Sequence, residues 1–131
     1  MLTTRQRLAG LLLCVLAAAV PAWWAALFAS DAFRRLFVEP GAWETLRPLL
    51  YADLGLAAVT VLAGARGLSG SLSAIVAGLA IGAWGYATLW TVGAAVTGSL
   101  STLGTMLMLV AFALVCAACH ALVSPRRSDD R

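Results

Sequence analysis

The sequence predicts an all-α integral membrane protein, organised over residues 1–131 as one compact bundle of four transmembrane helices. Hydrophobic residues make up 62% of the chain and charged residues 11%, whereas an average soluble domain is about half apolar and about a quarter charged. The apolar residues also gather in four runs that approach the roughly 20 residues of helix needed to cross the hydrocarbon core. A soluble domain of this length could not bury so much apolar surface, but a bilayer accepts it.

The first predicted span covers residues 8–29, which include no charged side chain. Pro21 lies inside this run and should kink the helix, because proline removes a backbone donor. A cleaved signal peptide is an alternative interpretation, in which Arg5 and Arg7 precede the apolar stretch and Val20–Ala22 resembles a cleavage site. Apolar sequence continues well past that site, which favours a retained helix.

The connection between the first two spans, residues 30–48, is the most polar part of the chain interior. Ser30 and Asp31 are residue types that cap the start of a helix. Pro40 and Gly41 then favour a turn. We therefore expect a short amphipathic helix or a structured loop here, carrying Phe33, Arg34, Arg35, Leu36 and Phe37.

Three further apolar runs predict the remaining spans, at approximately residues 48–65, 72–95 and 102–123. A glycine-rich connection containing Arg66 separates the second span from the third, and Thr97–Ser99 turns the chain into the fourth. The polar residues 124–131 are expected to form a disordered tail.

The arginine distribution predicts the orientation, because short cytoplasmic loops collect basic residues. The side that holds both termini carries more arginines than the opposite side, where acidic residues also dilute the positive charge. Both termini are therefore expected in the cytoplasm, with the protein in the cytoplasmic (inner) membrane. All nine basic residues are arginine, which favours a GC-rich, bacterial source. The two sets are Arg5, Arg7, Arg66, Arg126, Arg127 and Arg131 against Arg34, Arg35 and Arg47.

Asp53 is the acidic residue inside a predicted span and the main indication of a functional site. An ionisable side chain within a membrane is costly and usually faces protein or water. Its expected partner is an arginine of the first connection. Tyr86 and Thr88 of the third span are the alternatives. A role in pinning the first connection at the membrane interface is also open.

Aromatic residues gather in the same outer half of the predicted bundle as Asp53. Pockets typically combine apolar walls with a few polar groups, so this half is expected to bind a lipid or another amphiphile. An aromatic belt at the membrane interface is the alternative. The candidate site consists of Asp53, Arg34, Arg35, Arg47, Trp23, Trp24, Trp43, Tyr51, Tyr86 and Trp90.

Small residues recur at helical spacing in the third span. Gly78 and Gly82 form a G-x-x-x-G pattern that Ala74 extends, and such stripes allow close approach of a second backbone. A parallel stripe contains Ala83, Ala87 and Thr91. These stripes predict that the third span is central in the bundle. Contact with another subunit is the alternative.

The segment from Cys116 to His120 matches the C-x-x-C-H pattern of haem attachment. The match lies within the apolar fourth span, where it has no haem-enclosing domain, and no second cysteine pair is available for dithiol exchange. A soft-metal or zinc site would need Cys14, Cys116, Cys119 and His120 to converge. Buried thiols commonly act as small apolar packing groups, so a structural role is preferred and no cofactor is expected.

The functional prediction is a non-catalytic membrane subunit or an amphiphile-binding module. The chain lacks the G-x-x-x-x-G-K-[ST], H-E-x-x-H and G-x-S-x-G motifs, and His120 is its single histidine. Its net charge of +3 without a long basic run excludes a nucleic-acid partner. Expected partners are the bilayer, a lipid or amphiphile, and further copies of the chain or a larger membrane complex. An oligomeric small-solute transporter or channel is the main alternative, and a thiol-redox or metal-binding protein is the weaker one.

Overall fold

The computed structural model describes residues 2–124, and every regular element within that range is a helix. The predicted disordered tail lies outside the described residues, apart from Ser124. In chain order the helices are α1 (Thr4–Ala29), α2 (Asp31–Phe37), α3 (Trp43–Leu46), the 3-10 helix η1 (Arg47–Leu49), α4 (Leu50–Leu68), α5 (Ala74–Val96) and α6 (Thr102–Val123).

Four helical segments are long and apolar enough to cross a membrane, so the four predicted spans are confirmed in length and composition. They contain 22 to 26 residues each, and the second runs without a break through α3, η1 and α4. α1 begins earlier than predicted because Thr3 and Gln6 form a reciprocal capping box at its start. α1 also continues as a helix through Pro21.

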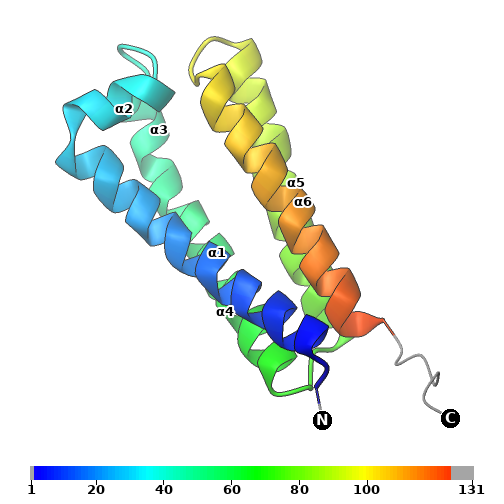
Figure 1. Cartoon of the computed structure of the whole chain (residues 1–131). Coiled ribbons are helices and arrows are strands. Elements are labelled where there is room, and N and C mark those ends of the chain that lie inside the picture. Colours follow the sequence, from blue (N-terminus) through cyan, green and yellow to red (C-terminus); the bar gives the residue numbers. More distant parts are fainter. Residues whose placement is uncertain (1, 125–131) are drawn as a thin grey trace, which may run out of the picture.

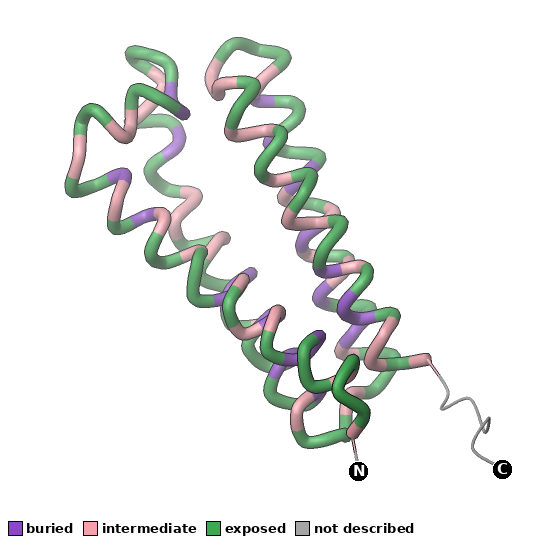
Figure 2. Tube along the Cα trace, in the orientation of Figure 1, coloured by how far each residue is buried: buried purple, intermediate pink, exposed green. Residues whose placement is uncertain are grey.

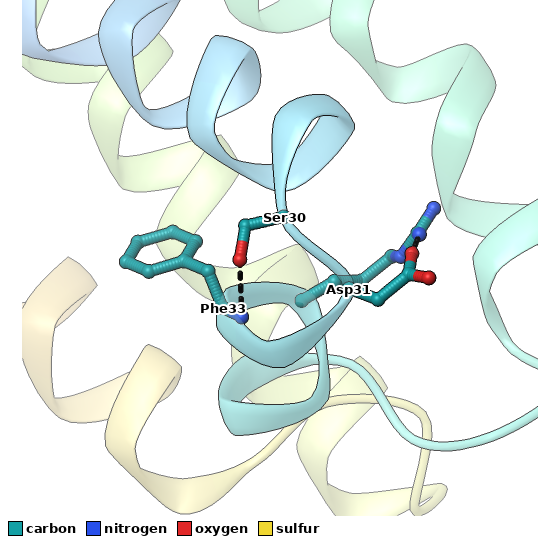
Figure 3. Close-up of polar contacts among 4 residues, drawn as sticks. Ser30, Asp31 and Phe33 are labelled. Carbon is teal, nitrogen blue, oxygen red and sulfur yellow. Dashed lines mark hydrogen bonds and ion pairs between the residues drawn. The ribbon is translucent and has the colours of Figure 1, made fainter.

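The predicted short helix after the first span is confirmed as α2. Ser30 caps it, since its hydroxyl oxygen accepts a hydrogen bond from the backbone N–H of Phe33 at 3.1 Å (Figure 3). Asp31 in its first turn forms an ion pair with Arg34 one turn later. The predicted turn that follows α2 is made by Gly41, whose φ of 89° favours glycine.

The spans are arranged as two antiparallel helix pairs, α1 with α4 and α5 with α6 (Figure 1). The start of α1, the end of α6 and the α4–α5 turn lie at one end, here called the terminal end. The short helices α2 and α3 and the α5–α6 turn lie at the other, here called the loop end. The two pairs diverge toward the loop end, so the bundle is less compact there than the sequence predicts.

Two clusters of buried residues hold this arrangement together. Buried residues are purple along the chain trace in Figure 2. The main core joins the two pairs and consists of Ala9, Leu13, Leu56, Ala63, Ala77, Ala80, Trp84, Val115, Ala118 and Cys119. The loop-end core consists of Trp24, Leu27, Phe37, Val38 and Leu46. At the loop end the pairs meet through a short bridge, in which the Ser101 backbone N–H donates to the Phe37 carbonyl at 2.8 Å.

The closest helix packing occurs between α1 and α4, and the prediction of α5 as the packing centre through its glycine stripe is wrong. A Cβ atom added to Gly64 would lie 2.7 Å from Sγ of Cys14 and 3.1 Å from the carbonyl oxygen of Gly10. A Cβ added to Gly78 or Gly82 would meet no described atom within 4 Å, and both glycines are exposed. The reason is that α5 turns a different face inward, one that carries the large side chain of Trp84.

Candidate functional site

Asp53 lies in the first turn of α4 at the loop end, with its side chain half-buried. Its Oδ2 accepts a hydrogen bond from Nε1 of Trp24 at 2.8 Å. Trp24 is a buried residue of α1, which packs along α4, so the contact joins the two helices. The prediction that Asp53 pairs with an arginine of the first connection is therefore wrong.

Two of the three loop arginines instead have acidic partners one helical turn before them. Arg34 pairs with Asp31, and its guanidinium also lies 4.6 Å from the ring centre of Trp43. Nη1 of Arg47 lies 3.3 Å from Oε2 of Glu44. Asp31 and Glu44 lie one helical turn from these arginines, so the ion pairs form within the connection itself. Asp53 is instead paired with the indole N–H that α1 places beside it. The third loop arginine, Arg35, is exposed and forms no ion pair within residues 2–124.

Three of the four tryptophans predicted for the site belong to two groups of aromatic rings at the loop end. Trp24, Phe28 and Trp43 form the first group, with ring centres between 5.1 Å and 6.2 Å apart. The second group is Trp23, Phe33 and Phe37, with ring centres 4.3 Å to 5.4 Å apart. The site predicted from the sequence omitted these phenylalanines. The spacing of four residues from Trp24 to Phe28 and from Phe33 to Phe37 was the available signal.

The remaining aromatic residues of the predicted site do not join these groups. Tyr86 and Trp90 lie on the exposed side of α5, with 73% and 36% of their surface accessible. Tyr51 is 78% exposed on α4. The expectation that all of these rings wall one pocket with Asp53 is therefore wrong, because α5 turns Tyr86 and Trp90 away from the bundle. The Thr88 hydroxyl, the other alternative partner for Asp53, donates to the carbonyl of Trp84 in its own helix.

An open groove of about 540 Å³ lies at the loop end of the α1–α4 pair. Its lining is Phe28, Arg47, Pro48, Leu50 and Tyr51. Phe28 also contacts the rings of Trp24 and Trp43. The groove therefore borders the aromatic group that contains Trp24, the hydrogen-bond partner of Asp53. Arg47 and Tyr51 are thus the two residues of the predicted site that line a concave surface.

A second contact between tryptophan and a polar residue fixes α5 to α4. Nε1 of the buried Trp84 donates to Oγ1 of the buried Thr60 at 2.8 Å, and that hydroxyl donates to the Leu56 carbonyl at 2.7 Å. The Trp84 indole N–H, the Thr60 hydroxyl and the Leu56 carbonyl are therefore all paired with one another in the interior of the helices. This contact was not predicted from the sequence, in which neither Trp84 nor Thr60 was among the residues singled out.

The cysteines are dispersed over the main core and its edge. Cys14 packs against Gly64, Cys119 is buried, Cys116 is half-buried, and all three thiols are free. His120 is exposed and lies 3.3 Å from the Ser124 hydroxyl. Within residues 2–124, no three His, Cys, Asp or Glu side chains come close enough together to hold a metal ion. The thiol-redox and metal alternatives gain no support from this placement.

Comparison with protein-family models, with curated proteins and with solved structures gave no match. The loop end of the α1–α4 pair thus combines an open, mostly apolar groove that Arg47 lines with a carboxylate that accepts a hydrogen bond from the Trp24 indole.

Proposed function

We propose that the protein is a non-catalytic multi-pass membrane protein that binds a lipid or another amphiphile at its loop end. The observation that carries the proposal is the groove of about 540 Å³ beside the Trp24–Asp53 contact. Phe28, Leu50 and Tyr51 offer an apolar lining, and Arg47 contributes a charge. Ligand sites of about 300–1,000 Å³ commonly combine an apolar lining with a few polar groups.

The proposed orientation places the loop end outside the cytoplasmic membrane and both termini in the cytoplasm of a bacterium. The excess of arginine at the terminal side, which includes Arg66 in the last turn of α4, supports this orientation. In this arrangement the groove lies in the outer leaflet, where headgroups and the first methylene groups of lipids are found. Its depth therefore matches that of an amphiphile already resident in the bilayer.

An oligomeric transporter or channel is the second proposal, and the exposed Gly78–Gly82 face of α5 is the observation that favours it. That face leaves room for a second subunit. The buried polar side chains give transport less support. The hydroxyls of Thr60, Thr88 and Thr91 each donate to the carbonyl four residues earlier in their own helix. Hydroxyls satisfied in this way do not need water.

Two matched tyrosine variants test the amphiphile-binding proposal. Tyr51 lines the groove, whereas Tyr86 has nearly the same exposure on a different helix. Native mass spectrometry of protein purified in a mild detergent should detect co-purified lipid in the wild type and in Tyr86→Ala. Tyr51→Ala should lose most of that lipid while keeping the wild-type melting temperature. Equal lipid retention by all three proteins contradicts the proposal.

A further inference from the structure

We infer that the groove takes a phospholipid, whose phosphodiester is bound by the guanidinium of Arg47 while an acyl chain lies against Phe28, Leu50 and Tyr51. This inference rests on the proposed function and adds the headgroup chemistry of the ligand. It follows from the availability of Arg47, from its position relative to the apolar lining, and from the contrast with the other loop arginines.

The guanidinium of Arg47 is available to a ligand. Its side chain is 53% exposed and contacts Glu44 through one nitrogen and one oxygen at 3.3 Å, and the Glu44 side chain is 75% exposed. Exposed ion pairs of this kind contribute little to stability. Because a guanidinium has several N–H donors in a fixed planar fork, a single contact leaves donors that can bind phosphate oxygens in a bidentate manner.

The lining residues follow the polarity of a phospholipid. Arg47 lies in η1, on the loop side of α4, and Leu50 and Tyr51 follow it in the first turn of α4. Phe28 comes from the last turn of α1 at the same end. Going from the loop end into the span, a ligand would therefore meet a cation first and apolar side chains next. A phospholipid presents its phosphate and acyl chains in that order.

The other loop arginines lack this combination of charge and apolar groove. The Arg34 side chain is 22% exposed, and both Asp31 and the ring of Trp43 occupy its guanidinium. Arg35 is exposed but does not line the groove. Arg47 is therefore the arginine whose replacement should change headgroup selection, and Arg35 is a matched control from the same connection.

Binding of defined lipids to the full-length protein tests the inference. The purified protein in detergent is titrated with dioleoyl phosphatidylglycerol, dioleoyl phosphatidylcholine, dioleoylglycerol and oleate, and bound lipid is measured by native mass spectrometry. Both phospholipids should bind about tenfold more tightly than dioleoylglycerol, as expected for charge-assisted hydrogen bonds to phosphate. Arg47→Gln should lower phospholipid binding to the level of dioleoylglycerol, and Arg35→Gln should leave it unchanged.

If Arg47→Gln fails to fold, a variant that is expected to raise the phospholipid affinity still tests the inference. Glu44→Gln removes the competing carboxylate, so it should raise phospholipid affinity without raising that for dioleoylglycerol. An unchanged or lower phospholipid affinity in Glu44→Gln overturns the inference. So does wild-type binding of dioleoylglycerol that equals the binding of phospholipid, or oleate binding that exceeds it.

The two levels of the proposal fail in different ways. If Tyr51→Ala weakens the binding of every lipid but Arg47→Gln weakens none, the groove binds amphiphiles without reading the phosphate, and only the inference is wrong. If Tyr51→Ala leaves all of these lipids bound as in the wild type, the groove is not the binding site and the proposed function fails with the inference.

Discussion

The α1–α4 interface and the outward face of α5 both contain glycines, but they differ in what faces them. Gly64 of α4 lies against Gly10 and Cys14 of α1, so close that an added Cβ would be 3.1 Å from backbone atoms of both. Gly78 and Gly82 of α5 form the more recognisable G-x-x-x-G pattern, and yet an added Cβ at either meets nothing within 4 Å in the described chain.

The difference shows that a small-residue stripe defines a possible contact but not its partner. Close approach between α1 and α4 requires small residues on both helices, and Gly10, Cys14 and Gly64 meet that requirement together. α5 packs by another mechanism, since Trp84 fills the space toward α4 and its indole N–H needs the acceptor that Thr60 offers. A buried tryptophan with a hydrogen-bond partner thus decides which face of α5 turns inward.

The largest effect is expected for Gly64→Ala, which tests the close side of this comparison. The new methyl group would press on the backbone of α1 and on Cys14, so the helices must separate. Overpacking of this kind typically costs about 1–3 kcal/mol of unfolding free energy. SDS titration in mixed micelles measures that loss.

The matched control for Gly64→Ala is Gly55→Ala on the same helix. A Cβ at Gly55 meets no atom within 4 Å among residues 2–124. Its stability should equal or slightly exceed that of the wild type, since alanine favours a helix more than glycine does. If Gly64→Ala and Gly55→Ala behave alike, the α1–α4 contact is looser than the structure has it.

A second prediction concerns the polar contact of the same interface, between Trp24 and Asp53. A double-mutant cycle of Trp24→Phe and Asp53→Leu should give a coupling energy of about 1–2 kcal/mol, because the hydrogen bond joins an indole N–H to a carboxyl group in a partly buried position. Asp53→Asn alone should cost less than Asp53→Leu, since an amide oxygen still accepts from the indole.

The corresponding cycle with a loop arginine provides the control for Asp53. Arg47 pairs with Glu44 and not with Asp53, so Arg47→Gln and Asp53→Leu should be additive within about 0.5 kcal/mol. Additivity in the Trp24 cycle combined with coupling in the Arg47 cycle contradicts the structure. It would restore the arginine partner that the sequence predicts.

The spans and the short helix were predictable because their signals are local. Each span is recognised from the length of an apolar run, and the Ser30 cap from the chemistry of a single hydroxyl. The local ion pairs Asp31–Arg34 and Glu44–Arg47 were also available from their spacing of three residues. With those pairs assigned, the arginines would not have been expected at Asp53.

The packing direction of each span was not predictable in the same way. α5 is apolar on all sides, so its sequence does not reveal which face meets α4. The exposed Tyr86 and the buried Trp84 lie only two residues apart, and no local signal separates them. What distinguishes Trp84 from Tyr86 is Thr60 on α4, which accepts a hydrogen bond from the Trp84 indole. The structure therefore gives Asp53 and two of the loop arginines other partners than the sequence predicts, and the candidate site itself stays a prediction.

The smallest effect on stability is expected for Gly82→Leu, on the open side of the comparison. A Cβ at this position meets no described atom within 4 Å, and the substitution is on an exposed face, so the unfolding free energy of the monomer should change by less than about 0.5 kcal/mol. The informative measurement is the mass of the protein–detergent complex. An unchanged mass means that this face of α5 contacts lipid. A reduced mass, with Gly55→Leu on α4 leaving it unchanged, means that Gly82 lies between subunits, because leucine would block the close backbone approach that glycine allows. That result would favour the oligomeric alternative while leaving the α1–α4 groove available to a lipid in every subunit.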